Sequence, residues 1–260
     1  MKPYFELDGV AIYHGDTLNV LNELSTPTVH AVITDPPYAS GARTEAAKAT
    51  SGAMVRGMRW NAKPIENDQM TSTGFVWLMR ETCYAVRDLL VDGGSLLIFI
   101  DWRQWPNLTG AVETTNFRVN QMIVWDKGSM GMGSGFRNQH ELILHASKGT
   151  VRVDSHSTSN VLQFSRVAND DHPSPKPEPL MRRLIEVVCA RGELVLDPFM
   201  GAGTTLVAAR QTGRRAIGIE IEEQYCEIAA RRLCQEMPFE IPAFPVHVIN
   251  NDLFAQEVTP

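Results

Sequence analysis

Short apolar runs rich in β-branched residues alternate with longer amphipathic segments along this chain, and this alternation limits the folds it can adopt. Runs of the first kind are typical of buried strands, whereas an apolar residue at every third or fourth position is typical of a helix packed on a sheet. Strands that alternate with helices predict an α/β fold with a mostly parallel sheet. The predicted strands are Val10–Tyr13, Val29–Thr34, Ser95–Ile100, Gln121–Trp125, Glu141–His145, Leu194–Leu196 and Ala216–Ile219.

Four segments between these strands have the apolar spacing of one helix face. They are Ser72–Leu90, the segment after Pro179, and the two stretches Thr204–Gln211 and Glu222–Leu233. Two further segments, Ala39–Pro64 and Thr150–Asp171, have no sustained period and are predicted to be irregular. Because long loops in a compact α/β domain often carry function, both are candidates for contact with a substrate.

The length and composition favour one domain over residues 1–260, because 43% hydrophobic residues can fill a sizeable core. Met1–Glu6 contains no apolar leader, and no stretch approaches the roughly 18 apolar residues that a membrane span needs. The four cysteines lie far apart in apolar stretches and are predicted to be buried thiols. We therefore expect a cytoplasmic protein without a membrane partner.

One polar motif, Thr34-Asp35-Pro36-Pro37-Tyr38, stands at the end of a predicted strand. In open α/β sheets ligands bind outside the carboxyl ends of the strands, so Asp35 faces the edge where chemistry is expected. Two successive prolines stiffen the turn, and the Asp35 carboxylate and Pro36 carbonyl are then a rigid pair of hydrogen-bond acceptors. Such a pair can bind both hydrogens of an exocyclic amino group and free its lone pair for attack on a methyl carbon. Tyr38 adds a flat face on which a base can stack. The same tetrapeptide could also be an ordinary turn that ends a strand.

A second motif joins a buried strand to a helix through a glycine turn. Gly201 and Gly203 would let the backbone approach a ligand closely, and Glu220 follows at the distance of the acid that binds ribose in dinucleotide folds. The third glycine of the dinucleotide fingerprint is replaced by Leu206, which disfavours a dehydrogenase, and the phosphate-binding loop of ATPases is absent from the sequence. The motif residues are Asp197, Pro198, Phe199, Gly201, Gly203, Thr204 and Thr205.

Together the two motifs resemble the amino-methylating DNA methyltransferases, the N6-adenine and N4-cytosine family, in the β-class order with the catalytic motif first. The resemblance extends in consistent order from Gly15 to Leu233. Its further matches are Gly15-Asp16, Asp92-Gly93-Gly94-Ser95, Trp125-Asp126-Lys127, His140-Glu141-Leu142-Ile143-Leu144, His172-Pro173-Ser174-Pro175-Lys176-Pro177, Gly213-Arg214-Arg215-Ala216-Ile217-Gly218-Ile219-Glu220 and Tyr225.

The resemblance implies a Rossmann-like methyltransferase sheet of seven strands with helices on both faces. It implies a catalytic half over about residues 10–149, a target-recognition candidate at 150–171, a cofactor half over about 172–236 and a tail at 237–260. Asp35, Pro36, Pro37 and Tyr38 would be catalytic, and S-adenosylmethionine would bind over Asp197–Thr205 with Glu220 on its ribose. Asp16 and Lys176 would lie near the cofactor, although each could also be an ordinary solvated residue, whereas Glu141 is expected to be a strand or packing residue.

The resemblance implies double-stranded DNA as the substrate. It favours adenine N6 over cytosine N4, because within that family Asp at the first position of the catalytic motif is commoner among adenine enzymes. The net charge of −6 argues mildly against nucleic-acid binding, yet Ala39–Pro64 contains five basic residues and one acidic residue. The residues predicted to contact phosphates are Arg43, Lys48, Arg56, Arg59 and Lys63. Lys127–Asn138 and Thr150–Asp171 are predicted to select the target sequence.

Several alternatives stay open at this point. The same turn could methylate a base in RNA or a free small molecule, and a catalytically silent binding subunit could retain the fold. Methylation at cytosine carbon 5 is disfavoured because it needs a cysteine nucleophile, usually after proline, and the chain has no Pro-Cys pair. The histidines are scattered and predict no metal site. A homodimer is expected from the resemblance alone.

Overall fold

The structure is a computed structural model, and it describes residues 1–24, 28–38, 70–131, 134–152, 157–166 and 176–235. The predicted basic loop with Arg43, Lys48, Arg56, Arg59 and Lys63 lies outside these residues, as does the tail at 237–260. Within the described part, no helix is long and apolar enough to cross a membrane. No group of three or more potential metal ligands gathers in that same part.

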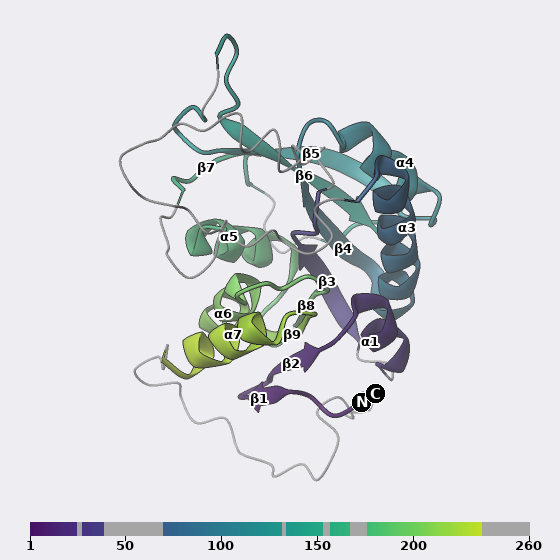
Figure 1. The fold of residues 1–260 in the computed structure, drawn as a ribbon, viewed down its shortest axis with the longest axis vertical. Coiled ribbons are helices and arrows are strands. Elements are labelled where there is room, and N and C mark those ends of the chain that lie inside the picture. The colour runs from purple at the N-terminus through teal and green to yellow at the C-terminus, as the bar shows by residue number, and fades with distance from the viewer. Residues whose placement is uncertain (25–27, 39–69, 132–133, 153–156, 167–175, 236–260) are drawn as a thin grey trace.

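A single mixed sheet of nine strands forms the centre of the molecule, in the order β1-β2-β9-β8-β3-β4-β6-β5-β7 (Figure 1). The expectation of seven strands was therefore wrong by two, because β1 and β7 are edge strands of three residues, too short for an apolar pattern. β7 also shows that part of Thr150–Asp171, predicted to be irregular, pairs with β5. The strands are β1 (Phe5–Leu7), β2 (Val10–His14), β3 (Val29–Thr34), β4 (Leu90–Ile100), β5 (Arg118–Asp126), β6 (His140–Ser147), β7 (Val161–Gln163), β8 (Leu194–Asp197) and β9 (Arg215–Glu220).

Helices cover both faces of this sheet, as predicted. In Figure 1, α1, α3 and α4 lie on one side, and α5, α6 and α7 lie on the other. The sequence pattern did not predict α1 and α4, which are short; α1 has seven residues and α4 has nine, with a proline in its first turn. The helices are α1 (Thr17–Glu23), α3 (Ser72–Leu89), α4 (Trp105–Glu113), α5 (Glu178–Val188), α6 (Thr204–Gln211) and α7 (Glu223–Gln235).

Two hydrophobic cores result, because successive side chains of a strand point to opposite faces. In β4, Leu96 and Ile98 belong to the core under α3 and α4, whereas Leu97 and Phe99 belong to the core under α5, α6 and α7. Of the cysteines, three are buried as predicted, but Cys234 is exposed near the end of α7, so that prediction was wrong for one thiol.

The parallel strands bring three predicted site residues to one edge of the sheet. β8 pairs in parallel with both β3 and β9, so the residues at or after their carboxyl ends lie side by side. Asp35, Asp197 and Glu220 occupy these positions. β6 runs antiparallel to β4, with Leu142 opposite Ile100, and its first residues therefore reach the same edge from the opposite direction.

Candidate active site

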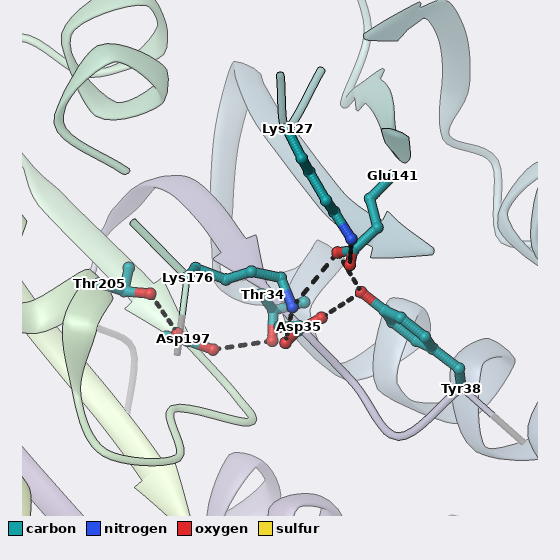
Figure 2. Close-up of polar contacts among 8 residues, drawn as sticks. All are labelled: Thr34, Asp35, Tyr38, Lys127, Glu141, Lys176, Asp197 and Thr205. Carbon is teal, nitrogen blue, oxygen red and sulfur yellow. Dashed lines mark hydrogen bonds and ion pairs between the residues drawn. The ribbon is translucent and has the colours of Figure 1, made fainter. Parts of the chain in front are cut away.

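The Asp35 carboxylate lies at the centre of a cluster of charged and polar side chains beyond β3. Its Oδ1 accepts a hydrogen bond from the Tyr38 hydroxyl, and its Oδ2 is paired with the ammonium of Lys176 (Figure 2). Asp35 is half-buried and Pro36 is buried. The turn thus presents a carboxylate at the edge of the sheet, where the sequence predicted it, but with both oxygens already bound to donors.

Lys176 precedes α5 and points into this cluster rather than into solvent. The side chain is only 7% exposed, and its Nζ lies 5.6 Å from the centre of the Tyr38 ring and 5.2 Å from that of Phe99. Burial by itself would lower the pKa of Lys176, but attraction to Asp35 and Glu141 outweighs it and raises this pKa. Lys176 therefore carries its charge next to the carboxylate of the predicted catalytic motif.

Two residues of the cluster, Glu141 and Lys127, were not predicted to lie beside the catalytic motif, although Lys127 begins a segment that was predicted to select the target sequence. Glu141 lies in β6 as expected, but its Oε2 is 3.5 Å from Lys176 Nζ and 3.5 Å from the Tyr38 hydroxyl, while its Oε1 binds Lys127. Burial would raise the pKa of Glu141, yet the two lysines lower it, so the carboxylate is ionised. Lys127 and Glu141 lie close together because β5 and β6 pair antiparallel, with Trp125 opposite Glu141 and Lys127 two residues after Trp125.

Asp197 joins the strand of the catalytic motif to the glycine turn. Its Oδ1 accepts from the Thr34 hydroxyl at 2.8 Å and from the Phe199 backbone N–H at 3.1 Å, and its Oδ2 accepts from the Thr205 hydroxyl (Figure 2). The residue is 3% exposed. Its carboxyl group thus holds β3, β8 and the start of α6 together, and both of its oxygens are bound to groups of the protein.

The buried position of Asp197 predicts a pH dependence of folding. Burial raises its pKa to about 7, although three hydrogen bonds oppose the shift. An unfolded Asp has a pKa of about 4, so between about pH 4 and pH 7 the native state holds a proton that the unfolded chain has released. This residue therefore makes the free energy of unfolding fall as the pH rises through that window.

The variant Asp197→Asn tests this expectation, because an amide stays neutral and can still accept from Thr34 and Phe199. We expect the difference in unfolding free energy between wild type and variant to shift in favour of the variant by a few kcal/mol from pH 4 to pH 7, measured by urea denaturation. A difference that stays constant over this range would show that Asp197 is ionised throughout.

The predicted glycine turn between β8 and α6 is present, and both of its glycines have a left-handed backbone. Gly201 and Gly203 have φ of 51° and 77°. A Cβ at Gly203 would lie 2.6 Å from the Cβ of Ala229 in α7, so this glycine is required for helix packing as well as for the turn. The Pro198 carbonyl accepts from the Thr17 hydroxyl at 2.7 Å, which fastens the turn to the start of α1.

Glu220 closes the turn at the end of β9. Its Oε2 accepts from the Gly201 N–H at 2.9 Å, and its Oε1 accepts from the Glu222 N–H at 2.8 Å. Burial raises its pKa, although these backbone donors hold the increase down. Each carboxylate oxygen has a second lone pair, so Glu220 can also accept from the hydroxyls of a bound ribose.

Asp16 and Thr204, also predicted to lie near a cofactor, have structural partners of their own. Asp16 caps α1 by accepting from the Asn19 N–H at 3.0 Å. The Thr204 hydroxyl accepts from Arg232 of α7 at 3.1 Å. The capped helix nevertheless lies against the glycine turn through Thr17, so Asp16 stands close to the predicted cofactor motif.

Comparison with known proteins places these features in a family. The model of a DNA methylase family, N6_N4_Mtase, matches residues 29–231. Type II methyltransferase M2.DpnII of Streptococcus pneumoniae is 28% identical over 255 residues, covering 89% of this chain and 92% of that protein. The putative methylase YubD of Escherichia coli K12 is 28% identical over 219 residues, covering 84% of this chain and 88% of that protein.

Solved structures share the fold. The M1.HpyAVI–SAM complex superposes with a TM-score of 0.63 at 24% identity, covering 85% of this chain and 98% of that one. The cytosine-N4-specific PvuII DNA methyltransferase superposes with a TM-score of 0.70 at 18% identity, covering 89% of this chain and 88% of that one. The predicted Rossmann-like methyltransferase fold is thereby confirmed.

Proposed function

This chain belongs to the DNA methylase family whose model matches residues 29–231, and from that premise we propose that it transfers a methyl group from S-adenosylmethionine to the exocyclic N6 of adenine in double-stranded DNA. One observation carries the proposal: the carboxylate of Asp35 and the glycine turn of Gly201 and Gly203 meet at one edge of the sheet, joined through Asp197. A base held at Asp35 would thus be adjacent to a cofactor held over that turn.

The proposed chemistry follows from the stiff acceptors of the catalytic turn. Asp35 and the Pro36 carbonyl accept the two hydrogens of the amino group, which favours a pyramidal nitrogen with an available lone pair. Bound S-adenosylmethionine would supply an electrophilic methyl group, whose bond to sulfur breaks, with the electron pair staying on sulfur, as the bond to nitrogen forms. The methylated nitrogen then releases one proton to solvent. The ring of Tyr38 can stack on the extruded base while its hydroxyl orients Asp35, and the negative charge of Asp35 stabilises the positive charge that develops on the nitrogen.

The residues of the glycine turn fit an adenosine-containing cofactor. Gly201 and Gly203 carry no side chain, so a ligand can approach the backbone of the turn closely there, and Glu220 offers acceptors of the kind that ribose hydroxyls need. The solved M1.HpyAVI–SAM complex has this fold. We assign the cofactor to Asp16, Asp197–Thr205 and Glu220 on this basis, with Lys176, the partner of Asp35, near it.

The choice of adenine over cytosine rests on Asp35 as the first residue of the catalytic motif. Cytosine N4 is the second candidate, favoured by the likeness to the cytosine-N4-specific PvuII enzyme. Both bases present an exocyclic amino group with two hydrogens, so the same acceptors would serve either. A homodimer remains a prediction from the resemblance.

The function is tested by incubating the purified protein with labelled S-adenosylmethionine and unmethylated duplex DNA, followed by nucleoside digestion and mass spectrometry. N6-methyladenine in the digest is the expected result. N4-methylcytosine would overturn the choice of base and keep the mechanism. Label in RNA but not in DNA would change the substrate class, and no label in either would favour a silent binding subunit.

Among the residues that the structure describes, those of the loop between β5 and β6, at 127–131 and 134–139, are a candidate for contact with DNA. The loop begins with Lys127 of the charged cluster and exposes two large apolar side chains, Met130 at 58% and Phe136 at 109% of their reference areas. A hydrogen bond from the Gly131 N–H to the Asn138 carbonyl, at 2.8 Å, joins the two sides of this loop. Apolar wedges of this kind insert between base pairs and unstack them. We therefore assign Phe136 to the opening of the duplex around the target base.

Phe136→Ala is expected to lower kcat/KM about 10-fold on a fully paired duplex, because unstacking a base costs a few kcal/mol. On a duplex whose target base lies opposite an abasic site, the loss should be less than about 3-fold. Steady-state kinetics on the two duplexes measure this difference. Tyr84→Ala is the control and should change neither value, because Tyr84 is an exposed aromatic of α3 whose hydroxyl donates to the Thr114 carbonyl after α4. Equal losses on both duplexes would contradict the assignment of Phe136 to the opening of the duplex.

A further inference from the structure

Both oxygens of the Asp35 carboxylate have donors in the structure, although the proposed reaction needs this carboxylate for the amino group of the base. Oδ1 is bound by the Tyr38 hydroxyl and Oδ2 by the Lys176 ammonium. A hydroxyl can share an oxygen with a second donor at little cost. A buried ammonium at Oδ2 occupies the space that the amino group must enter, so Lys176 has to move for the base to bind.

A buried ammonium cannot simply lose its partner. The Lys176 side chain is 7% exposed, and an uncompensated buried charge costs several kcal/mol. Its departure from Asp35 therefore requires a second anion within a short movement. Among the residues that the structure describes, the ion pairs of Lys176 are with Asp35 and with Glu141, whose Oε2 lies 3.5 Å from Nζ.

Glu141 is prepared for this role by its other contacts. Lys127 binds its Oε1, which leaves Oε2 directed toward Lys176 and the Tyr38 hydroxyl (Figure 2). The two lysines lower the pKa of Glu141 despite burial, so it is already an anion while Lys176 is still bound to Asp35. The cluster contains two carboxylates, Asp35 and Glu141, and two ammonium groups, Lys127 and Lys176. When Lys176 moves from one carboxylate to the other, the total charge of the cluster stays the same.

The movement also suits the charge that develops during the reaction. The amino nitrogen becomes positive as it attacks the methyl carbon, and an adjacent ammonium would oppose this change. With Lys176 on Glu141, the negative charge of Asp35 faces the nitrogen without a competing cation.

We propose that Glu141 is a positioning residue of the methyl transfer: it receives Lys176 when the amino group of the base takes the place of that lysine on Asp35. Glu141 itself need not touch the base. This inference rests on the proposed function, since it assigns Glu141 a part in the same reaction.

The test is a double-mutant cycle of single-turnover rates on duplex DNA, with the wild type, Glu141→Gln, Lys176→Met and the double variant. Glu141→Gln should slow transfer roughly 10- to 100-fold, because Lys176 then stays on Asp35. Affinities for S-adenosylmethionine and DNA should stay within about 3-fold of wild type. In the Lys176→Met background, where no ammonium competes for Asp35, the same Glu141→Gln change should alter the rate less than about 3-fold.

Glu193→Gln is the matched control, since Glu193 is a 19% exposed carboxylate paired with Arg152 away from the cluster, and its rate should equal that of wild type. If Glu141→Gln does not fold, Lys127→Met/Glu141→Gln removes one charge of each sign and replaces it in the cycle. The inference would be overturned if Glu141→Gln slowed transfer equally with Lys176 present and in the Lys176→Met variant, or if Glu141→Gln had the wild-type rate. Either result would leave the proposed function intact. Absence of transfer by the wild type would instead overturn the proposed function, and the inference with it.

Discussion

Asp35→Ala is expected to lower the rate of methyl transfer at least about 1000-fold while leaving the affinity for S-adenosylmethionine within about 3-fold of wild type. The variant removes the acceptor that activates the amino nitrogen and stabilises its developing charge. The side chain contacts Tyr38 and Lys176 rather than the glycine turn. Single-turnover kinetics measure the first quantity, and calorimetric titration with S-adenosylmethionine measures the second.

Glu220→Ala is the matched control for this separation of roles. Glu220 is bound to the backbone of the glycine turn and lies outside the charged cluster, so its loss should weaken cofactor binding far more than it slows transfer at saturating cofactor. Thermal melting of both variants checks that they fold, because Asp35→Ala leaves Lys176 with Glu141 as its carboxylate partner among the described residues. A collapse of cofactor affinity in a folded Asp35→Ala protein would contradict the assignment of Asp35 to the base.

The parts of the fold that the sequence predicted are those with strong local patterns. β3 was predicted with its observed bounds because Val29–Thr34 is rich in β-branched residues and buried at every position except His30, and α6 because Thr204–Gln211 directly follows a glycine turn. β1 and β7 were missed because three residues cannot display a period of two clearly. The helix α1 was missed because its seven residues bury only Thr17, Val20 and Leu21.

The candidate site divides in the same way. Asp35 and Tyr38 are three positions apart, so the turn that joins them can be recognised locally. The hydrogen bond from Thr34 to Asp197 joins residues 163 positions apart, and the pair of Lys176 with Asp35 spans 141 positions. Glu141 reaches the cluster only because β6 runs antiparallel to β4. The direction of a strand depends on sheet pairing, and a single apolar run does not reveal it.

Lys176 shows how a position can be predicted without its contacts. The resemblance placed it near the cofactor, and the structure brings it to the carboxylate of the catalytic motif. A lysine between prolines has no apolar period, so nothing local indicates that it is buried. Its burial is a matter of tertiary contacts, since its ammonium pairs with Asp35 just beyond β3 and lies 5.2 Å from the centre of the Phe99 ring.

Gly203→Ala is expected to lower the free energy of unfolding by about 2–4 kcal/mol and to weaken cofactor binding as well. One part of the loss is backbone strain, because φ at Gly203 is 77°. The larger part is a steric clash, since the new Cβ would lie 2.6 Å from Ala229 Cβ and 3.3 Å from its Cα, which forces α7 away from the turn. Urea denaturation measures the stability, and titration with S-adenosylmethionine measures the binding.

Two variants separate the clash from the strain. Gly213 lies just after α6, the helix that Gly203 precedes, and it has φ of 76°. A Cβ there would meet no atom within 4 Å, so Gly213→Ala should cost only the backbone strain of about 1 kcal/mol. Ala229→Gly removes the clashing methyl group at a helix-propensity cost of about 1 kcal/mol, and combined with Gly203→Ala it should cost less than the two single losses added together. If Gly203→Ala and Gly213→Ala are equally destabilising, and Ala229→Gly adds its full cost to the former, the turn is not packed against α7. Gly203 would then be required for its backbone conformation alone.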